Sequence, residues 1–263
     1  FLYDFLAHRA VDFFMNEQAR ITTPIYAFQV DKPGYFLPAQ EFTKINIQSA
    51  DTLSLKVYAL TILQNIIASH LNDKEPNALI DADLKRLQLV RNHAVFSEKD
   101  SLYLQALENL EKQFVNHEAS AEVAYKIAQY YYQLGSQYKP FEADTFKWLT
   151  KKALEICNQT IQKFPKSFGA KQCSSLKETI FQKSLSFQVE FANPSNAFLK
   201  ASLTYKNVKK VWCKIIKVDW EDYYKNNENR YGEKLIQYFN SFKAKNEWML
   251  ELPDDGDFQQ HIT

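Results

Sequence analysis

The sequence has little glycine and no excess of either charge, and each scarcity excludes a class of function. Only 5 of its 263 residues are glycine, which leaves few of the flexible loops that cradle phosphate groups and argues against a nucleotide-dependent enzyme. The formal net charge is +1, and basic residues alternate with acidic ones instead of forming blocks. Such a chain has no long-range field to attract a phosphate backbone, so nucleic acid is not an expected partner.

Long hydrophobic runs are also missing. No stretch of about 18 apolar residues occurs, so no segment of this chain is expected to span a membrane. The chain starts at Phe1 without a basic leader or an apolar signal core and enters a helical pattern directly. We therefore expect a piece of a longer protein, whose compartment these features leave open.

Motifs that carry catalysis or bind metals are absent as well. There is no Gly-x-Ser-x-Gly elbow, no phosphate-binding loop and no His-Glu-x-x-His pair. The 5 histidines are scattered without the spacing of zinc ligands. The acidic run Asp254–Asp257 lacks the alternating oxygen ligands and the closing Glu of a calcium loop. We predict no enzymatic activity, no cofactor and no metal in this chain.

What the sequence does have is the composition of a folded protein. Apolar residues make up 46% and charged residues 24%, and the 20 Phe and 15 Tyr provide large rings to fill interfaces. A chain of this length holds one or two domains. The side-chain pattern changes near Ser184, which favours two.

Helical periodicity runs through residues 1–183. Residues 1–17 predict an amphipathic helix, and three apolar stripes between residues 51 and 114 predict three more. Short breaks at 72–76 and 97–100 predict antiparallel hairpins, with Asp100 as an N-cap. The apolar face of the first helix is expected to contain Leu2, Phe5, Leu6, Ala10, Phe13 and Phe14, and the first stripe to contain Leu53, Val57, Leu60, Leu63, Ile67 and Leu71.

Residues 22–48 form an exception, because four helix-interrupting residues predict an extended segment there. We expect this segment to wrap across the helices through aromatic side chains. The interrupting residues are Pro24, Pro33, Gly34 and Pro38, and the aromatic ones are Tyr26, Phe28, Tyr35 and Phe36.

The next helical pair resembles a tetratricopeptide repeat, in which small residues let two helices approach closely and a proline ends the second. The repeat is diverged, since Ala124 replaces a common tryptophan and the loop after Ser136 is long. The pattern consists of Ala121, Ala124, Ile127, Ala128, Tyr131 and Gly135, followed by Ala153, Cys157, Thr160 and Pro165.

Tyrosines cluster at the end of the first helix of this pair. Two roles fit Tyr130, Tyr132 and Tyr138: they line a concave groove that binds a partner peptide, or most of them pack between helices together with Tyr131.

After Ser184 the period changes to two, which predicts an antiparallel sheet. Strands are expected at 187–191, 201–205, 211–215 and 248–252, with another beginning at Phe258. A turn at 193–196, a polar loop at 219–232 and a short helix with Leu235, Phe239 and Phe242 separate them. The predicted fold class is therefore α+β: a tetratricopeptide-like helical domain over 1–183, followed by an antiparallel β-sandwich over 184–263 that is incomplete.

Three parts of the sequence resemble one family, the large alpha-2-macroglobulin-like envelope proteins of Bacteroides-type bacteria. Residues 2–10 are similar to the opening of their helical region, and residues 153–173 to its end. Residues 205–208 and 252–258 together resemble their first macroglobulin-type sandwich domain.

The resemblance implies a scaffold segment of a protein that traps proteases or protects the envelope. It implies a location in the periplasm or anchored at the outer membrane, with proteases or other envelope proteins as partners. The thioester motif Cys-x-x-Gln of that family does not occur at Cys157, Cys173 or Cys213. Any trapping chemistry is expected outside this segment.

An oxidising periplasm would permit a disulfide between Cys157 and Cys173, which we expect on neighbouring helices around Pro165. Closing a loop of that size would stabilise the fold by roughly 3 kcal/mol. The alternative is a pair of small buried thiols. Cys213 is expected to be a packed free thiol on a strand.

Three functions follow, in order of preference. The first is a non-catalytic scaffold and interaction segment of a macroglobulin-like envelope protein. The second is a stand-alone tetratricopeptide-like module that binds a peptide or an envelope partner. The third is a glycan hydrolase whose two carboxylates lie on distant helices, an arrangement that we do not expect to find.

Overall fold

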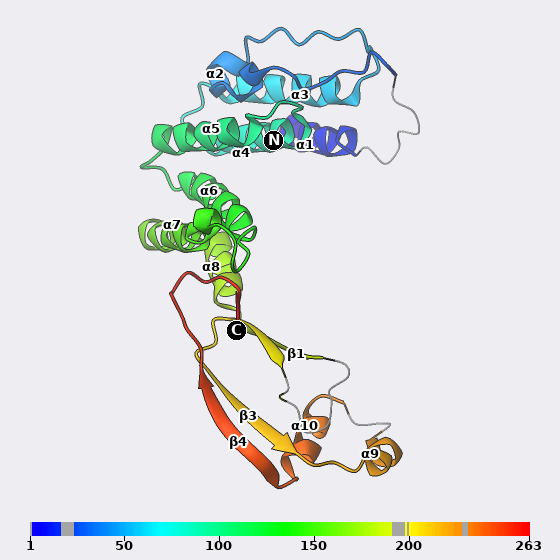
Figure 1. The fold of residues 1–263 in the computed structure, drawn as a ribbon. Helices are drawn as coiled ribbons and strands as arrows, with labels where there is room; N and C mark the ends of the chain where they lie inside the picture. The colour runs from blue at the N-terminus through cyan, green and yellow to red at the C-terminus, as the bar shows by residue number, and fades with distance from the viewer. Residues whose placement is uncertain (1, 17–23, 191–197, 199, 228–230) are drawn as a thin grey trace. The chain divides into compact units, whose positions relative to one another are not determined.

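The computed structural model describes residues 2–16, 24–190, 198, 200–227 and 231–263. The chain forms two compact units (Figure 1). The first contains Phe1–Gln137 and Asp144–Ile180, and the second contains Tyr138–Ala143 and Phe181–Thr263. Helices make up the first unit, and small antiparallel sheets with two short helices make up the second. The predicted α+β class is confirmed.

The first unit is a series of helices in which each long helix, as far as α7, packs on a sequence neighbour. Figure 1 shows them from blue to yellow-green. The long helices are α1 (Leu2–Phe14), α3 (Leu55–His70), α4 (Asn77–His93), α5 (Lys99–Gln113), α6 (Ser120–Gly135), α7 (Leu149–Lys163) and α8 (Phe168–Phe181). Three single-turn elements accompany them: η2 (Pro33–Phe36), α2 (Ala39–Phe42) and η3 (Asp144–Phe146).

The predicted stripe of α3 is largely buried, and one of its residues is corrected. Leu60, Leu63 and Ile67 have no exposed surface, but Leu53 lies before the helix and is 74% exposed.

The predicted N-cap of α5 is also wrong. Glu98 occupies the cap position, and the Asp100 carboxylate instead accepts a hydrogen bond of 2.7 Å from Nε of Arg91. An ion pair with α4 therefore takes the oxygen that capping would have used.

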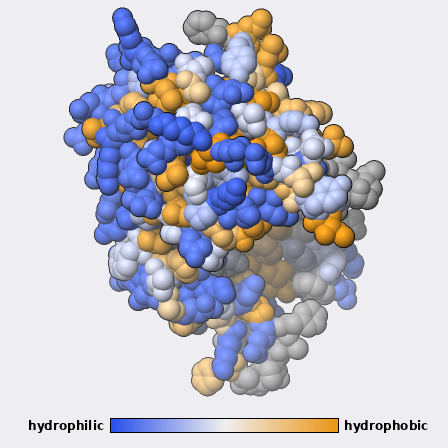
Figure 2. Space-filling model, turned by 90° about the horizontal axis from the view of Figure 1, so that it is seen from above, coloured by the Kyte–Doolittle hydropathy of each residue, from blue (hydrophilic) through white to orange (hydrophobic). Residues whose placement is uncertain are grey.

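Helix α1 packs on α3 through a face that only partly matches the predicted one, since Phe14 is half-buried with its ring centre 5.6 Å from that of Tyr58. Ala7 and Val11 are buried, whereas Leu2, Phe5, Leu6 and Phe13 are at least 55% exposed. Small side chains allow α1 to approach its neighbours closely, which leaves the large ones outside. On the face that Figure 2 shows, hydrophobic residues are interspersed among hydrophilic ones.

His70 joins α1 to the end of α3. Its Nε2 lies 3.2 Å from Oδ1 of Asp4, and its Nδ1 lies 2.6 Å from Oδ2 of Asp73. Burial acts to lower the pKa of His70, but the hydrogen bonds to Asp73 and Asp4 outweigh it, so the pKa is raised.

This raised pKa predicts that stability depends on pH through His70. The contribution of the protonated ring is fully present below its unfolded pKa of about 6.5 and is lost as pH rises through the folded value. Urea denaturation of the wild type and of His70→Gln should therefore differ by about 1 kcal/mol at pH 5.5 and by much less at pH 8.5. A difference that stays constant or grows with pH would contradict this assignment.

The described part of the extended segment, residues 24–48, is here called the strap. It is less irregular than predicted, because it contains η2 and α2. Pro33 is the first residue of η2 and Pro38 precedes α2, so these prolines begin helical turns that their fixed φ favours. Tyr35 and Phe36 are buried as the wrapping prediction requires, whereas Tyr26 is 65% exposed.

Buried polar groups hold the strap on α3 and α4. Arg86 of α4 is 1% exposed; its Nε donates to Oδ1 of Asp83 at 2.7 Å, and its Nη1 donates to the carbonyl of Tyr35 at 2.6 Å. The guanidinium also lies 4.5 Å from the centre of the Phe42 ring. From α3, Nε2 of Gln64 donates to two carbonyls at the end of α2.

Two glycines lie where helices meet, Gly135 of the tetratricopeptide-like pattern and Gly169 after it. A Cβ atom at Gly135 would lie 2.8 Å from the backbone nitrogen of Thr150, at the start of α7. A Cβ atom at Gly169 in α8 would lie 2.5 Å from the backbone nitrogen of Glu122 and closer still to the Ala121 carbonyl group. Both glycines therefore permit backbone contact that any side chain would prevent.

The described residues of the second unit form two antiparallel sheets. In the first, β2 (Ala201–Lys206) lies between β1 (Ser184–Val189) and β5 (His261–Ile262), with Phe187 opposite Leu203. In the second, β3 (Lys210–Ile216) pairs with β4 (Ala244–Glu251). The buried core consists of Leu203, Tyr205 and Leu252. The alternate residues Leu185, Phe187 and Val189 of β1 are 47% to 61% exposed.

Two helices lie between β3 and β4. The predicted short helix is α10 (Glu233–Asn240), with Phe242 just beyond its end. The predicted polar loop is wrong over α9 (Trp220–Asn227), where the Asp219 carboxylate accepts a hydrogen bond of 2.9 Å from the Glu221 amide and so favours a first helical turn.

The last predicted strand is shorter than expected. Phe258 has a φ of 59°, outside the extended region, and pairing with β2 begins at His261 and continues through Ile262 to Thr263, which exchanges two backbone hydrogen bonds with Leu203. Phe191 and the predicted turn at 193–196 lie outside the described residues.

Candidate functional site

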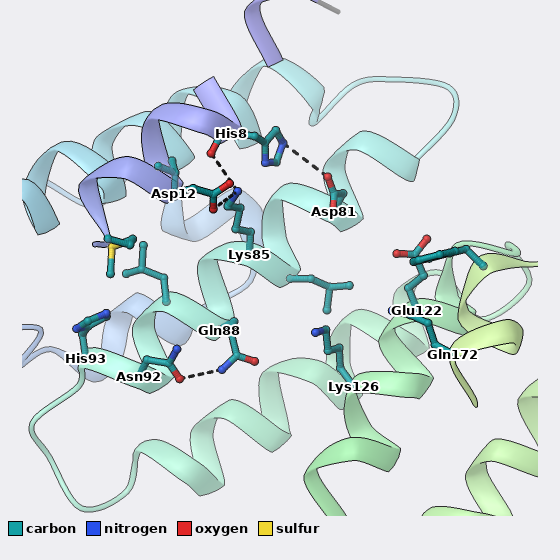
Figure 3. A pocket seen from close by; sticks show the side chains of 15 residues that line it. His8, Asp12, Asp81, Lys85, Gln88, Asn92, His93, Glu122, Lys126 and Gln172 are labelled. Atoms are coloured by element: carbon teal, nitrogen blue, oxygen red, sulfur yellow. Dashed lines mark hydrogen bonds and ion pairs between the residues drawn. The ribbon is translucent and has the colours of Figure 1, made fainter. Parts of the chain in front are cut away.

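The helical unit contains a groove of about 610 Å³ between α1, α4, α6 and α8 (Figure 3). Its floor is apolar and buried, whereas its walls carry both signs of charge. This combination is typical of sites that bind polypeptide or small polar molecules. The groove is lined by His8, Val11, Asp12, Met15, Asp81, Leu84, Lys85, Gln88, Leu89, Asn92, His93, Glu122, Lys126, Phe168 and Gln172.

The wall formed by α1 and α4 is internally paired. Nζ of Lys85 lies 2.7 Å from Oδ1 of Asp12 and donates to the carbonyl of His8 at 3.1 Å. Nε2 of His8 lies 3.6 Å from Oδ2 of Asp81. These contacts fasten α1 to α4, so this wall is a preformed surface.

The opposite wall comes from α6 and α8 and is less paired. Glu122 is half-buried and has no ion-pair partner among the described residues. Burial raises the pKa of its carboxyl, and the negative charge of Asp81 raises it further, while Lys126 acts in the opposite direction. Figure 3 shows Glu122 and Lys126 across the groove from Asp81. Glu122 is thus the carboxylate of the groove that most lacks a cation.

Asp81 and Glu122 bring two carboxylates from distant parts of the sequence to one groove, which is the element that the hydrolase alternative requires. The Asp81 side chain is 68% exposed, so water screens its charge, and it is engaged with His8. Within the part of the chain that the structure describes, no three or more His, Cys, Asp or Glu side chains are grouped to hold a metal ion.

The tyrosines singled out in the sequence do not line this groove. Tyr130 is 6% exposed; its ring lies 6.2 Å from that of Tyr103, under the guanidinium of Arg91 at 5.0 Å. Tyr132 is half-buried, and Tyr138 belongs to the second unit. Tyr130 and Tyr131 therefore pack between helices, the second of the two predicted roles.

The groove residues were not predicted from the sequence, although the spacing of polar residues on α4 indicates some of them. Asp81, Lys85, Gln88 and Asn92 follow one another at helical spacing on a helix whose other faces are buried. A polar stripe on an otherwise buried helix marks the face that neighbouring helices leave open.

Cys157 of α7 and Cys173 of α8 are both fully buried thiols on neighbouring helices. The hydrogen bond between the two thiols and their burial raise the pKa of Cys157. Cys213 on β3 is a half-buried free thiol.

This proximity leads to a prediction for the disulfide. Protein from an oxidising compartment should resist alkylation at both cysteines even after unfolding, until a reductant is added, and the reduced form should lose roughly 3 kcal/mol of stability. Mass spectrometry of the alkylated chain would measure this, with Cys213 as the internal control that labels in every sample. Labelling of all three cysteines without a reductant would rule out the bond.

No helix in the described part of the chain has the length and apolar character needed to cross a membrane. Comparison of the chain with protein-family models, with curated proteins and with solved structures gives no match. The resemblance to alpha-2-macroglobulin-like proteins therefore remains a prediction from the sequence.

Proposed function

We propose that this chain is a non-catalytic scaffold and interaction segment of an alpha-2-macroglobulin-like envelope protein. In this proposal α6 and α7 form a diverged tetratricopeptide repeat, and the strands of the second unit begin a macroglobulin-type sandwich. The proposed location is the periplasm or the outer membrane, and the proposed partners are proteases or other envelope proteins.

The observation that supports this role is that two of the three family-like stretches, residues 153–173 and 252–258, contain buried structural positions, whereas residues 2–10 are mostly exposed. In residues 153–173, Cys157, Thr160 and Cys173 lie in helix interfaces. In residues 252–258, Leu252 lies in the core of the second unit, and Asp257 is 1% exposed. Residues with such roles maintain a fold, which is what a scaffold segment needs.

Contacts around residues 252–258 illustrate this role. The Tyr205 hydroxyl donates to the Pro253 carbonyl at 3.0 Å, and its ring stacks on His261. Nε2 of His261 lies 3.0 Å from Oδ1 of Asp257, which also accepts a hydrogen bond from the Gln259 amide. The turn after β4 is thereby fastened to β2 and β5.

Fractionation of the native cells tests the proposal. An antibody against the chain should detect the protein in the osmotic-shock or outer-membrane fraction, with a cytoplasmic enzyme as the control for lysis. Co-fractionation with that enzyme would contradict an envelope role.

The groove favours a second candidate function, a tetratricopeptide-like module that binds a polypeptide segment. The groove has a preformed wall, an apolar floor and an opposite wall with an unpaired carboxylate. A concave site of this kind can enclose an extended ligand, which a flat surface cannot do. The purified chain should then bind peptides by itself, whereas a purely architectural segment should bind none.

An activity measurement distinguishes the hydrolase alternative from the two binding proposals. Both binding proposals predict that the wild type releases no more product from chromogenic glycosides than Glu122→Gln does. Release that depends on Glu122 would contradict them and make the groove an active site.

A further inference from the structure

The groove contains a carboxylate whose charge the protein does not neutralise. Glu122 is half-buried on α6, and Asp81 projects from α4 on the other side of the groove (Figure 3). Among the described residues, Asp12 has an ion pair with Lys85 and Asp81 lies 3.6 Å from the His8 ring, but no ion pair within 4.0 Å reaches Glu122.

Lys126, one turn further along α6, is the cation whose charge opposes the rise in the Glu122 pKa, and no ion pair within 4.0 Å joins the two side chains. Its ammonium group lies 5.8 Å from the centre of the Tyr125 ring on the same helix. Lys126 therefore acts on Glu122 over a distance. Its charge lowers the pKa of Glu122 by less than burial and the charge of Asp81 together raise it. A half-buried carboxylate beside a second carboxylate is least stable when no cation lies between them.

An aromatic ring lies on the rim of the same groove. Phe168, the first residue of α8, is 61% exposed, although burying a ring of this size is favourable. The floor beneath is apolar, with Leu84 and Leu89 buried. A long basic side chain has the matching chemistry, since its methylene stem or guanidinium plane covers a ring while its charged end meets carboxylates.

We infer that the groove binds an extended segment of a partner polypeptide by its lysine or arginine side chain, which pairs with Glu122 and Asp81 and packs against Phe168. This inference rests on the peptide-binding function proposed above and names its ligand. Acidic segments and phosphate groups are disfavoured because they would bring a third negative charge to these two carboxylates.

Fluorescence anisotropy with the full 263-residue chain tests the inference. The probes are four fluorescein-labelled dodecapeptide pools with Ala, Leu, Ser and Thr randomised at the flanking positions and a central Arg, Lys, Gln or Glu. We expect the Arg and Lys pools to bind at least about tenfold more tightly than the Glu pool, and this preference to shrink as salt is added.

Variants connect the preference to the groove. Glu122→Gln should weaken binding of the Arg pool about tenfold and leave the Gln pool unchanged, and Phe168→Ser should weaken both pools. Glu155→Gln removes an exposed carboxylate of α7 and is the matched control, which should bind as the wild type does. Circular dichroism would establish that each variant is folded.

The outcomes separate this inference from the function on which it rests. Equal binding of the Arg and Glu pools, or loss of binding in Glu155→Gln to the same extent as in Glu122→Gln, would overturn the selection of basic segments but leave peptide binding intact. If no pool binds, both proposals fail. Saturable binding of spermine in the absence of peptide binding would identify a small polyamine as the ligand and would also overturn the inference.

Discussion

Replacing Arg86 by Met should lower the free energy of unfolding of the helical unit by about 3–5 kcal/mol. Arg86 and Asp83 are 1% and 2% exposed, so the substitution leaves a carboxylate without a partner in the protein interior. It also removes the hydrogen bond to the Tyr35 carbonyl and the guanidinium above the Phe42 ring. The strap should therefore detach from α4 at lower denaturant concentration than the rest of the unit unfolds.

Urea denaturation followed by far-ultraviolet circular dichroism measures this effect. Lys171→Met on the exposed face of α8 is the control for loss of a positive charge and should change stability by less than about 0.5 kcal/mol. Asp83→Leu combined with Arg86→Met removes both charges and should recover much of the loss, because a buried pair is often replaceable by apolar residues. A loss below about 1 kcal/mol in the single variant would show that the guanidinium does not hold the strap.

Gly169→Ala is the second substitution with a large expected effect, a loss of about 3 kcal/mol. A methyl group there would overlap the Ala121 carbonyl group and lie 2.5 Å from the Glu122 amide nitrogen. Those atoms belong to the backbone of α6 and cannot turn away as a side chain could. Helix α8 would have to move outward, which would also disturb Phe168 on the rim of the groove.

Gly34→Ala is the matched control for this experiment. A methyl group at Gly34 would meet only the ends of two side chains, Ile45 and Leu37, both at 3.8 Å. The same chemical change should therefore be close to neutral there. Thermal unfolding of both variants measures the contrast, and equal loss at the two positions would mean that α8 does not lie against α6 as described.

Helix positions were predictable from the sequence because apolar spacing depends on local geometry. The choice of buried face was less predictable. In α1, periodicity identified Leu2, Phe5 and Phe13, yet the helix packs through Ala7 and Val11. Hydrophobicity ranks large side chains above small ones, whereas close packing of helices can favour the small ones.

The groove itself could not be predicted, because it requires four helices that are distant in sequence to meet. In the sequence, Glu122 is an ordinary acidic residue in the first turn of a helix. Only the folded structure places Asp81 across the groove from it. Similarly, the sequence predicts Asp100 as an N-cap, whereas in the structure its carboxylate accepts a hydrogen bond from Arg91 of the preceding helix. Both cases show tertiary partners replacing a local role.

The strap has a consequence for the order in which the chain folds. The bond between Arg86 and the Tyr35 carbonyl spans 51 residues, and the bonds from Gln64 span 22 and 19. Gln64 lies on α3 and Arg86 on α4, so the strap cannot make all of these bonds until both helices have formed. Loop closure of this kind is slow compared with helix formation. The strap, although it precedes both helices in the chain, therefore acquires its final conformation only after they have formed.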